Sequence, residues 1–439
     1  MQKKKSVSVS KKSKSFASRP KQKKVKQKKA PIKRKKPKND SNILGLFHDF
    51  SMSFKNRNSP PDKPLLILFI IFVVLGVLAV FDTSSVFASR IFNNPFHFVI
   101  LQLIWVTLGV GGFMVAYFLD YRLIRRFILV LYLLTLGLLA ATLFTSEING
   151  AKSWLSLGGF TLQPSELAKL TFVLYVSGIL ATKKIYKTTK EFILEDFLPF
   201  FLLLMLIVGF VLLGKDLGTS IIIMSVALIM YLFKASTSRE YYALMGLLVF
   251  CILGGVLMIA SLAYRGDRVA VWWHLNQTGE VLQPRDAGYQ VKQNLLGFGS
   301  GGIWGVGLNQ SLQKYDLPET TPATDSVFVI VSEEFGYVGA VALLLGYLLI
   351  IYRGLLIANN TADRYGQLVA LGIVAWLGMQ AFVHVASNVA LTPLTGVPIP
   401  FLSYGGSSIV SMMIAMGILL NISKQVNVST SVIKKGRLK

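Results

Sequence analysis

Four charged residues stand where an apolar chain rarely carries charge. Asp325 closes a long polar segment directly before an apolar run, and Asp216 separates two apolar runs. Glu166 and Lys169 lie three residues apart inside a third run. A carboxylate between an apolar helix and a basic segment can have a raised pKa, which suits a general base. Asp325 is therefore a candidate for removing the proton of an attacking hydroxyl group.

Each of these residues also has a structural interpretation. Asp325 and Asp216 could cap the helices that follow them, because an aspartate there accepts backbone N–H bonds and complements the helix dipole. Glu166 and Lys169 share one helix face, so they could form a buried ion pair or line a polar cavity open to the outside. For Asp216 we favour capping, with a share in positioning a catalytic residue; for the others both alternatives stay open.

Apolar runs of membrane-spanning length recur along the 439 residues, of which 53% are hydrophobic and 15% charged. A soluble globular protein has roughly 25% charged residues. Ten runs are long enough to cross a bilayer as helices: 65–82, 97–119, 127–145, 165–182, 197–214, 217–234, 241–263, 326–352, 367–388 and 401–421. The sequence predicts an all-α integral membrane protein with about ten transmembrane helices.

Lysine and arginine are unevenly distributed between the connections. With the N-terminus inside, the internal connections and tail hold sixteen: 120–126, 183–196, 234–240, 353–366 and 422–439. The short external connections hold three: 83–96, 146–163, 214–216 and 389–400. Positive residues accumulate on the cytoplasmic side. We therefore expect both termini in the cytoplasm. Residues 264–325, the long external loop, should contain short amphipathic segments at the outer face.

The N-terminal segment carries most of the net charge of +25, since residues 1–64 hold 21 Lys/Arg against three acidic residues. This composition favours a disordered cytoplasmic arm, 1–63, that is attracted to anionic lipid, and argues against a nucleic-acid tail. A ten-helix membrane domain is expected at 64–425 and a short basic tail at 426–439.

The sequence contains no convincing motif for a disulfide, a metal site or a dinucleotide site. Cys251 is the single cysteine, which excludes an intrachain disulfide, and the four histidines lack metal-ligand spacing. Gly297–Gly302 matches G-x-G-x-x-G but lacks the strand–helix unit of a dinucleotide site. Its glycines are expected to permit tight turns and close backbone approach.

An external site also restricts the substrate. Nucleotide sugars and ATP are absent outside the cell, so an activated donor has to arrive in the membrane, as a polyprenyl-pyrophosphate-linked sugar does. Loop cations could neutralise the pyrophosphate while Asp325 takes the proton of a sugar hydroxyl. A base in that position suits an inverting displacement.

A series of short motifs runs in order through residues 65–425. They are Asn149–Trp154, Gln163–Lys169, Asp216–Thr219, Arg268–Val269, Gly288–Gln290, Gly297–Leu308, Gln313–Lys314, Leu317–Glu319, Thr324–Asp325, Glu333–Gly336 and Pro400–Ser408. With these motifs the chain resembles the shape, elongation, division and sporulation (SEDS) family, and within it the cell-division branch, FtsW.

The resemblance implies a peptidoglycan glycosyltransferase that polymerises lipid II, the undecaprenyl-pyrophosphate-linked disaccharide peptide, at the outer face of the cytoplasmic membrane and at the division septum. It implies a class B penicillin-binding transpeptidase and other divisome membrane proteins as partners, and allows a divalent cation, Mg or Mn, with no metal ligand assigned. The family's catalytic aspartate matches Asp325. Substrate-binding positions are implied at Glu166, Lys169, Lys152, Asp216, Arg268, Gln290, Lys314, Glu319, Ser403 and Tyr404.

The chain departs from the family pattern in two places. The segment between Glu319 and Asp325 is two residues longer and lacks the usual histidine, and Lys215 replaces the usual proline before Asp216. Three alternatives remain beside the division polymerase: a lipid II flippase or other transporter, a non-catalytic scaffold, and a polymerase of the elongation or sporulation branch (RodA- or SpoVE-like).

Overall fold

Helices dominate the computed structural model, which describes residues 60–436 except 148–150, 159, 183–185, 262, 284, 286–287 and 319–320. Side chains are described over the same residues apart from 157, 160, 256–265 and 426–436. The predicted N-terminal arm therefore falls almost wholly outside the described residues, and its disorder stays a prediction.

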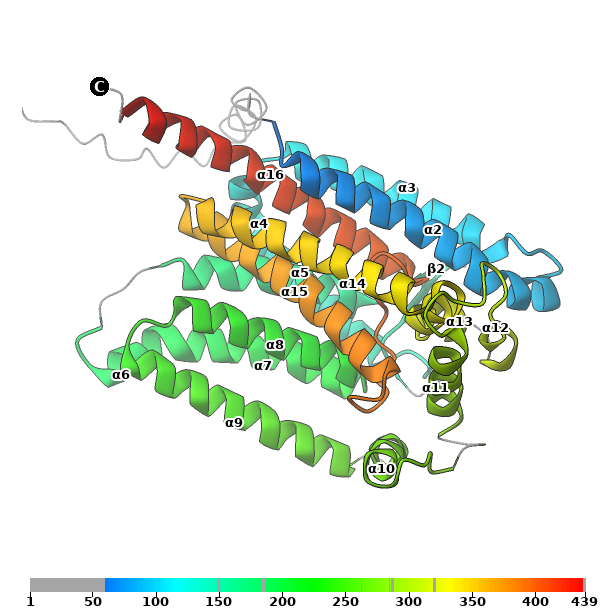
Figure 1. Cartoon of the computed structure of the whole chain (residues 1–439). Coiled ribbons are helices and arrows are strands. Elements are labelled where there is room, and N and C mark those ends of the chain that lie inside the picture. Colours follow the sequence, from blue (N-terminus) through cyan, green and yellow to red (C-terminus); the bar gives the residue numbers. More distant parts are fainter. Residues whose placement is uncertain are drawn as a thin grey trace, which may run out of the picture. The chain divides into compact units, whose positions relative to one another are not determined.

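Ten long helices correspond to the ten predicted spans (Figure 1). They are α2 (Lys63–Phe92), α3 (His97–Phe118), α4 (Tyr121–Thr142), α5 (Pro164–Leu180), α7 (Leu198–Leu213), α8 (Leu217–Lys234), α9 (Ser238–Ser261), α14 (Val327–Asn360), α15 (Arg364–Asn388) and α16 (Gly406–Gly436). Within the described residues, eight spans are long and apolar enough to cross a membrane. The 17-residue α5 and the 24-residue α9 complete the set. An all-α membrane protein is confirmed.

Prolines mark where two of the spans begin. Pro64 and Pro164 occupy the first turns of α2 and α5, where the N–H that proline lacks would have no acceptor within the helix.

The fifth span begins earlier than predicted, because α6 (Thr189–Phe192) and the π-helical turn η1 (Ile193–Phe197) run directly into α7. The last span begins later than predicted, since Phe401 has a φ of 66° and α16 starts only at Gly406.

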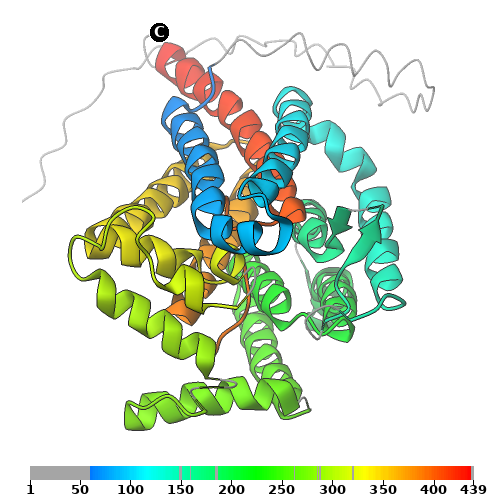
Figure 2. The ribbon, with the colours of Figure 1, turned by 90° about the vertical axis from the view of Figure 1, so that its right-hand side faces the viewer.

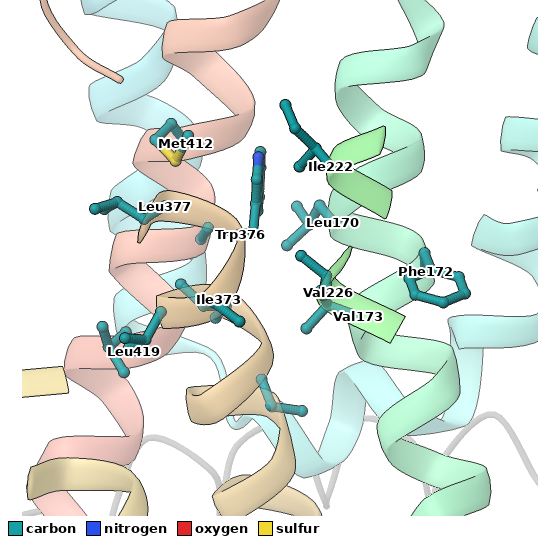
Figure 3. Packing of buried hydrophobic residues seen from close by; sticks show 14 of the residues in the cluster. Leu170, Phe172, Val173, Ile222, Val226, Ile373, Trp376, Leu377, Met412 and Leu419 are labelled. Carbon is teal, nitrogen blue, oxygen red and sulfur yellow. The ribbon is translucent and has the colours of Figure 1, made fainter. Parts of the chain in front are cut away.

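The centre of the bundle is formed by α15 and α16. In their most apolar stretches 78% of the residues are buried, against 28% in α2, α3 and α4. Figure 3 shows Trp376 of α15 between Met412 of α16 and the side chains Leu170 of α5 and Ile222 of α8. This apolar packing fixes the two helices whose connection, 389–405, reaches the candidate site.

The long loop between α9 and α14 contains four short helices at one end of the bundle, the right-hand end of Figure 1. They are α10 (Ala263–Thr278), α11 (Tyr289–Gly301), α12 (Gln313–Asp316) and α13 (Thr321–Thr324). The axis of α10 is seen end-on in Figure 1 and lengthwise in Figure 2, so α10 runs crosswise to the spans. The prediction of short segments in this loop is confirmed.

A small hairpin precedes α5, formed by β1 (Leu155–Leu157) and β2 (Phe160–Leu162), with Leu155 opposite Leu162. The sequence did not predict it, because strands of three residues are too short to show a period-two pattern.

Candidate active site

Asp325 lies in the turn between α13 and α14. The backbone N–H groups of Asp325 and Ser326 both donate to Thr321 O, at 3.0 Å each. The Asp325 side chain is partly exposed. The residue that caps α14 is Ser326, and no side chain in the described structure bonds its first turn as a cap. The capping alternative for Asp325 is therefore wrong, and its carboxylate is left for another role.

The surroundings of the Asp325 carboxylate change its acidity. Burial raises the pKa of Asp325, while the positive charge of Arg268 and a hydrogen bond from the Thr324 hydroxyl lower it. Arg268 belongs to α10, and its guanidinium is held in place by a bond from Nη1 to Leu394 O, 3.1 Å long, in the connection after α15. Net raising of the pKa beside a fixed cation suits a carboxylate that accepts and releases a proton.

Behind Asp325, a chain of three amides and one hydroxyl, all buried except the half-buried Gln290, joins α11, α14 and α15. Asn388 Nδ2 donates to Asp325 O, and Asn294 Nδ2 donates to Asn388 Oδ1, both at 2.9 Å. Ser326 Oγ donates to Asn294 Oδ1 at 2.9 Å, and Gln290 Nε2 donates to Ser326 Oγ at 3.3 Å. A satisfied buried network holds its members in one geometry. Gln290, predicted to bind substrate, is thus tied into the support of the turn.

The connection between α15 and α16 supports the same turn from another side. Ser403 Oγ donates to Thr324 O at 2.6 Å and accepts a bond from Ile399 N at 3.0 Å. The backbone N–H of Tyr404 donates to Ala323 O at 2.7 Å. Both predicted substrate-binding residues therefore position the backbone before the catalytic candidate, and their direct contact with substrate stays a prediction.

The pair of Glu166 and Lys169 lies deep in the bundle. Lys169 Nζ donates to Glu166 Oε1 at 2.7 Å and to Gln380 Oε1 at 2.8 Å. The two side chains are only 1% and 2% exposed, and Trp376 Nε1 donates to the same Gln380 oxygen at 2.8 Å. This sealed arrangement favours the structural ion pair over the lining of an open cavity.

Asp216 caps α8, as favoured from the sequence, and its carboxylate also links other segments. One oxygen accepts a backbone N–H of the first turn of α8, 3.0 Å away. The other accepts bonds from Gln163 Nε2 and Ser165 Oγ, at 3.1 Å each. Lys152 joins the region through its backbone, whose N–H donates to Gly214 O at 2.9 Å. The α7–α8 hairpin is thereby fixed to the start of α5.

Lys314 has a role that the sequence did not indicate. Its ammonium group is fully buried and contacts Asp82 Oδ1 at 2.6 Å, Asn309 Oδ1 at 3.3 Å, and Glu334. An ammonium has three donors, so all of them have partners within the protein. In this conformation no donor of Lys314 is left for the predicted substrate contact, and the residue ties the loop to α2 and α14.

The glycine-rich segment of the loop packs against a break in α14. Gly336 has φ 65° and ψ −167°, a conformation reserved for glycine. The N–H of Gly307 donates to Glu334 O at 3.0 Å, and a Cβ on Gly305 would lie 2.0 Å from that oxygen. The expected close backbone approach is confirmed.

The role of Glu319 and the binding of a divalent cation both stay expectations. Glu319 lies outside the described residues, so its role stays a prediction. Over the described part of the chain, no three His, Cys, Asp or Glu side chains are grouped as metal ligands.

Sequence reasoning missed Asn294, Asn388 and Gly396, although Asn388 ends an apolar run and could have been noticed there. A Cβ on Gly396 would lie 3.5 Å from Asp325 Oδ2, so this glycine forms a wall of the site.

These observations define a multi-span membrane protein with a supported carboxylate at one end of its bundle. Residues 62–428 match the FtsW/RodA/SpoVE family model, described as "Cell cycle protein". The chain therefore belongs to this family.

The match with this chain extends over almost the whole length of its named relatives. A protein of Geobacter sp. (strain M18) named "Probable peptidoglycan glycosyltransferase FtsW" is 34% identical, over 82% of this chain and 96% of its own. "Stage V sporulation protein E" of Bacillus subtilis (strain 168) is 32% identical, over 84% and 98%.

Solved structures have the same fold. One, described as "Structural coordination of polymerization and crosslinking by a peptidoglycan synthase complex", has a TM-score of 0.67 and 25% identity, covering 83% of this chain and 98% of that chain. The rod shape determining protein RodA of Thermus thermophilus has a TM-score of 0.58 and 25% identity, covering 83% and 96%.

Proposed function

We propose that this protein is a peptidoglycan glycosyltransferase that polymerises lipid II at the outer face of the cytoplasmic membrane during cell division. The observation that carries the proposal is Asp325, a supported, partly exposed carboxylate whose pKa is raised by burial. The reaction class is supported by membership of the family and by the name of several relatives, "Probable peptidoglycan glycosyltransferase FtsW".

The proposed reaction uses Asp325 as the general base. The 4-hydroxyl of an acceptor GlcNAc attacks C1 of a lipid-linked MurNAc, and its proton passes to the Asp325 carboxylate. The new C1–O bond forms as the bond from C1 to the pyrophosphate oxygen breaks, so undecaprenyl pyrophosphate leaves with the electron pair and the configuration at C1 inverts. The charge of Arg268, which acts on Asp325, would stabilise the leaving pyrophosphate.

The surroundings of the protein in the cell form the second part of the proposal. Both termini would lie in the cytoplasm and the long external loop outside, as the distribution of Lys and Arg favours. At the division septum a class B penicillin-binding transpeptidase and other divisome membrane proteins would be its partners. The structural relative described as a peptidoglycan synthase complex supports a crosslinking partner. Anionic lipid would bind the basic N-terminal arm.

The decisive experiment is polymerisation of purified lipid II by the full-length protein together with its transpeptidase. Asp325→Asn should lower the rate by about 10²–10⁴-fold, the usual contribution of a general base, while membrane insertion and thermal stability are kept. Asp316→Asn is the matched control, since Asp316 is an exposed aspartate of the same loop and should retain activity. Glycan chains formed by Asp325→Asn at the wild-type rate would refute the assignment.

Translocation of lipid II in liposomes, measured separately, tests the transporter alternative. A flippase would translocate lipid II equally with and without the Asp325 carboxylate, and would form no glycan.

A further inference from the structure

A basic cavity of about 430 Å³ lies at the end of the bundle opposite Asp325. Its lining residues are Arg122, Arg125, Arg126, Asp363 and Tyr365. The three arginines occupy the first two turns of α4, and the other two residues stand where α15 begins. Because α14 runs from the turn of Asp325 to this connection, the cavity and the candidate active site are separated by the length of a span.

The cavity has a surplus of positive charge. Its single carboxylate, Asp363, is already engaged: it accepts bonds from Gly366 N and Tyr121 Oη, each at 3.1 Å, and lies 4.0 Å from Arg122 Nε. Among the lining residues three guanidinium groups share this one carboxylate. Arg122 also donates to Gln425 Oε1 at 3.1 Å and is acted on by the charge of Asp120, so even with this second acid the positive charges are in excess. The Arg125 guanidinium also stacks over the Tyr365 ring, 5.1 Å from its centroid, which holds it at the cavity. Clustered guanidinium groups are suited to a phosphate.

A buried hydroxyl in the cavity wall points to a missing partner. Tyr365 is 1% exposed, and its hydroxyl group has no hydrogen-bond partner among the described residues. A buried donor without a partner costs free energy. A polar group bound in the cavity would supply an acceptor.

An apolar surface continues from the arginines along α4. Val130 and Leu134 follow Arg126 at intervals of four residues, which places them on the same helix face, and they are 63% and 60% exposed. A ligand with a phosphate group and hydrocarbon chains could contact the cavity and this face together. Inorganic phosphate or a soluble phosphate ester would leave the apolar face unused.

We infer that the cavity formed by Arg122, Arg125, Arg126 and Tyr365 binds the phosphate group of an anionic phospholipid, whose acyl chains lie along Val130 and Leu134 of α4. The site includes no residue of the N-terminal arm, 1–63, and does not depend on the proposed transferase activity. Anionic lipids are concentrated in the cytoplasmic leaflet, which agrees with the side on which the charge distribution puts this end.

Native mass spectrometry of the full-length protein tests the inference. Protein from mixed micelles of phosphatidylglycerol and phosphatidylcholine should retain phosphatidylglycerol selectively. Arg125→Gln with Arg126→Gln should lower this retention by roughly tenfold or more, as expected for two lost arginine–lipid contacts. The matched control is Lys190→Gln with Arg239→Gln, which removes two exposed charges near the starts of α6 and α9 and should leave retention unchanged.

Three results would overturn the inference. The first is equal retention of the lipid by the Arg125/Arg126 variant and wild type. The second is an equal loss of retention in the Lys190/Arg239 control. The third is displacement of the lipid by millimolar inorganic phosphate or glycerol phosphate, which would identify a soluble ligand. The basic arm is present in every variant, so its own lipid binding does not affect the comparison.

Discussion

Asp325 differs from the fully buried acids Glu166 and Glu334 in how its cation is held. Glu166 and Glu334 each have a lysine in direct contact. The cation that acts on Asp325, Arg268, is itself bonded to Leu394 O. Burial raises the pKa of Asp325 by more than the charge of Arg268 lowers it. Asp325 therefore keeps the capacity to change its protonation state.

This balance predicts a shift in the pH profile of polymerisation. A general base must be deprotonated, so activity falls as the pH falls through the pKa of Asp325. Arg268→Gln removes a charge that lowers this pKa, so the acidic limb should move to higher pH. The measurement is kcat/KM for lipid II against pH. Lys292→Gln, an exposed cation of the same loop, should leave the midpoint in place. An unchanged midpoint in Arg268→Gln would contradict the coupling.

Residue types alone predicted the reactive carboxylate but not the partners of the cations. Asp325 was visible because it stands at the junction of a polar loop and an apolar run. Lys314 looked like a substrate contact, yet its partners Asp82 and Glu334 lie 232 and 20 residues away. No local pattern connects residues so distant in the chain, and a resemblance to a family does not distinguish a supporting cation from a binding one.

At the scale of elements, the break in α14 joins the loop to the membrane bundle. The glycine-rich segment reaches this break, with Tyr337 N donating to Gly302 O at 2.9 Å. A Cβ on Gly336 would lie 2.3 Å from Gly305 N. The loop is thus anchored about three helical turns after Asp325.

Gly336→Ala should therefore destabilise the protein. The expected loss is about 1–3 kcal/mol for the strained backbone, increased by the clash with Gly305, and thermal unfolding in detergent would measure it. Gly299→Ala is the matched control in the same motif, since nothing lies within 4 Å of its Cβ and it is helical. That substitution should be neutral or stabilising. Equal melting of the two variants would show that the junction is not rigid.

Hydropathy predicted that each span exists, but it did not predict where each span ends. The first was expected to end at residue 82, whereas α2 continues to Phe92. Thr83 and Ser84 lie within this extension, where their hydroxyls donate to the carbonyls of the preceding turn, at 2.7 Å to Ala79 O and 2.6 Å to Val80 O. Hydropathy treats such residues as breaks, although a helix accommodates them.

At the scale of the whole molecule, the bundle separates two polar ends. The part of α14 after its break, residues 337–360, is roughly 36 Å long at the rise of an α-helix. This length exceeds a hydrocarbon core of about 30 Å. Asp325 and the arginine cavity are therefore expected on opposite sides of the membrane.

Single-cysteine labelling would test this topology. In a Cys251→Ala background, Lys292→Cys should react with a membrane-impermeant maleimide in intact cells. Arg239→Cys should react only after the membrane is permeabilised. Both positions are exposed, so accessibility does not differ between them. Labelling of Arg239→Cys in intact cells would reverse the proposed orientation.

The charged partners of α2 set an order for biosynthesis. Asp82, near one end of this helix, contacts Lys314, and Asp62, at the other, contacts Arg353. These partners are 232 and 291 residues further along the chain, and a ribosome adds about 5–20 residues per second. The first span must therefore wait on the order of ten seconds or more with both carboxylates unpaired. Its final seating belongs to the last stage of synthesis, so a ribosome that stops before residue 353 leaves the first helix of the bundle incompletely anchored.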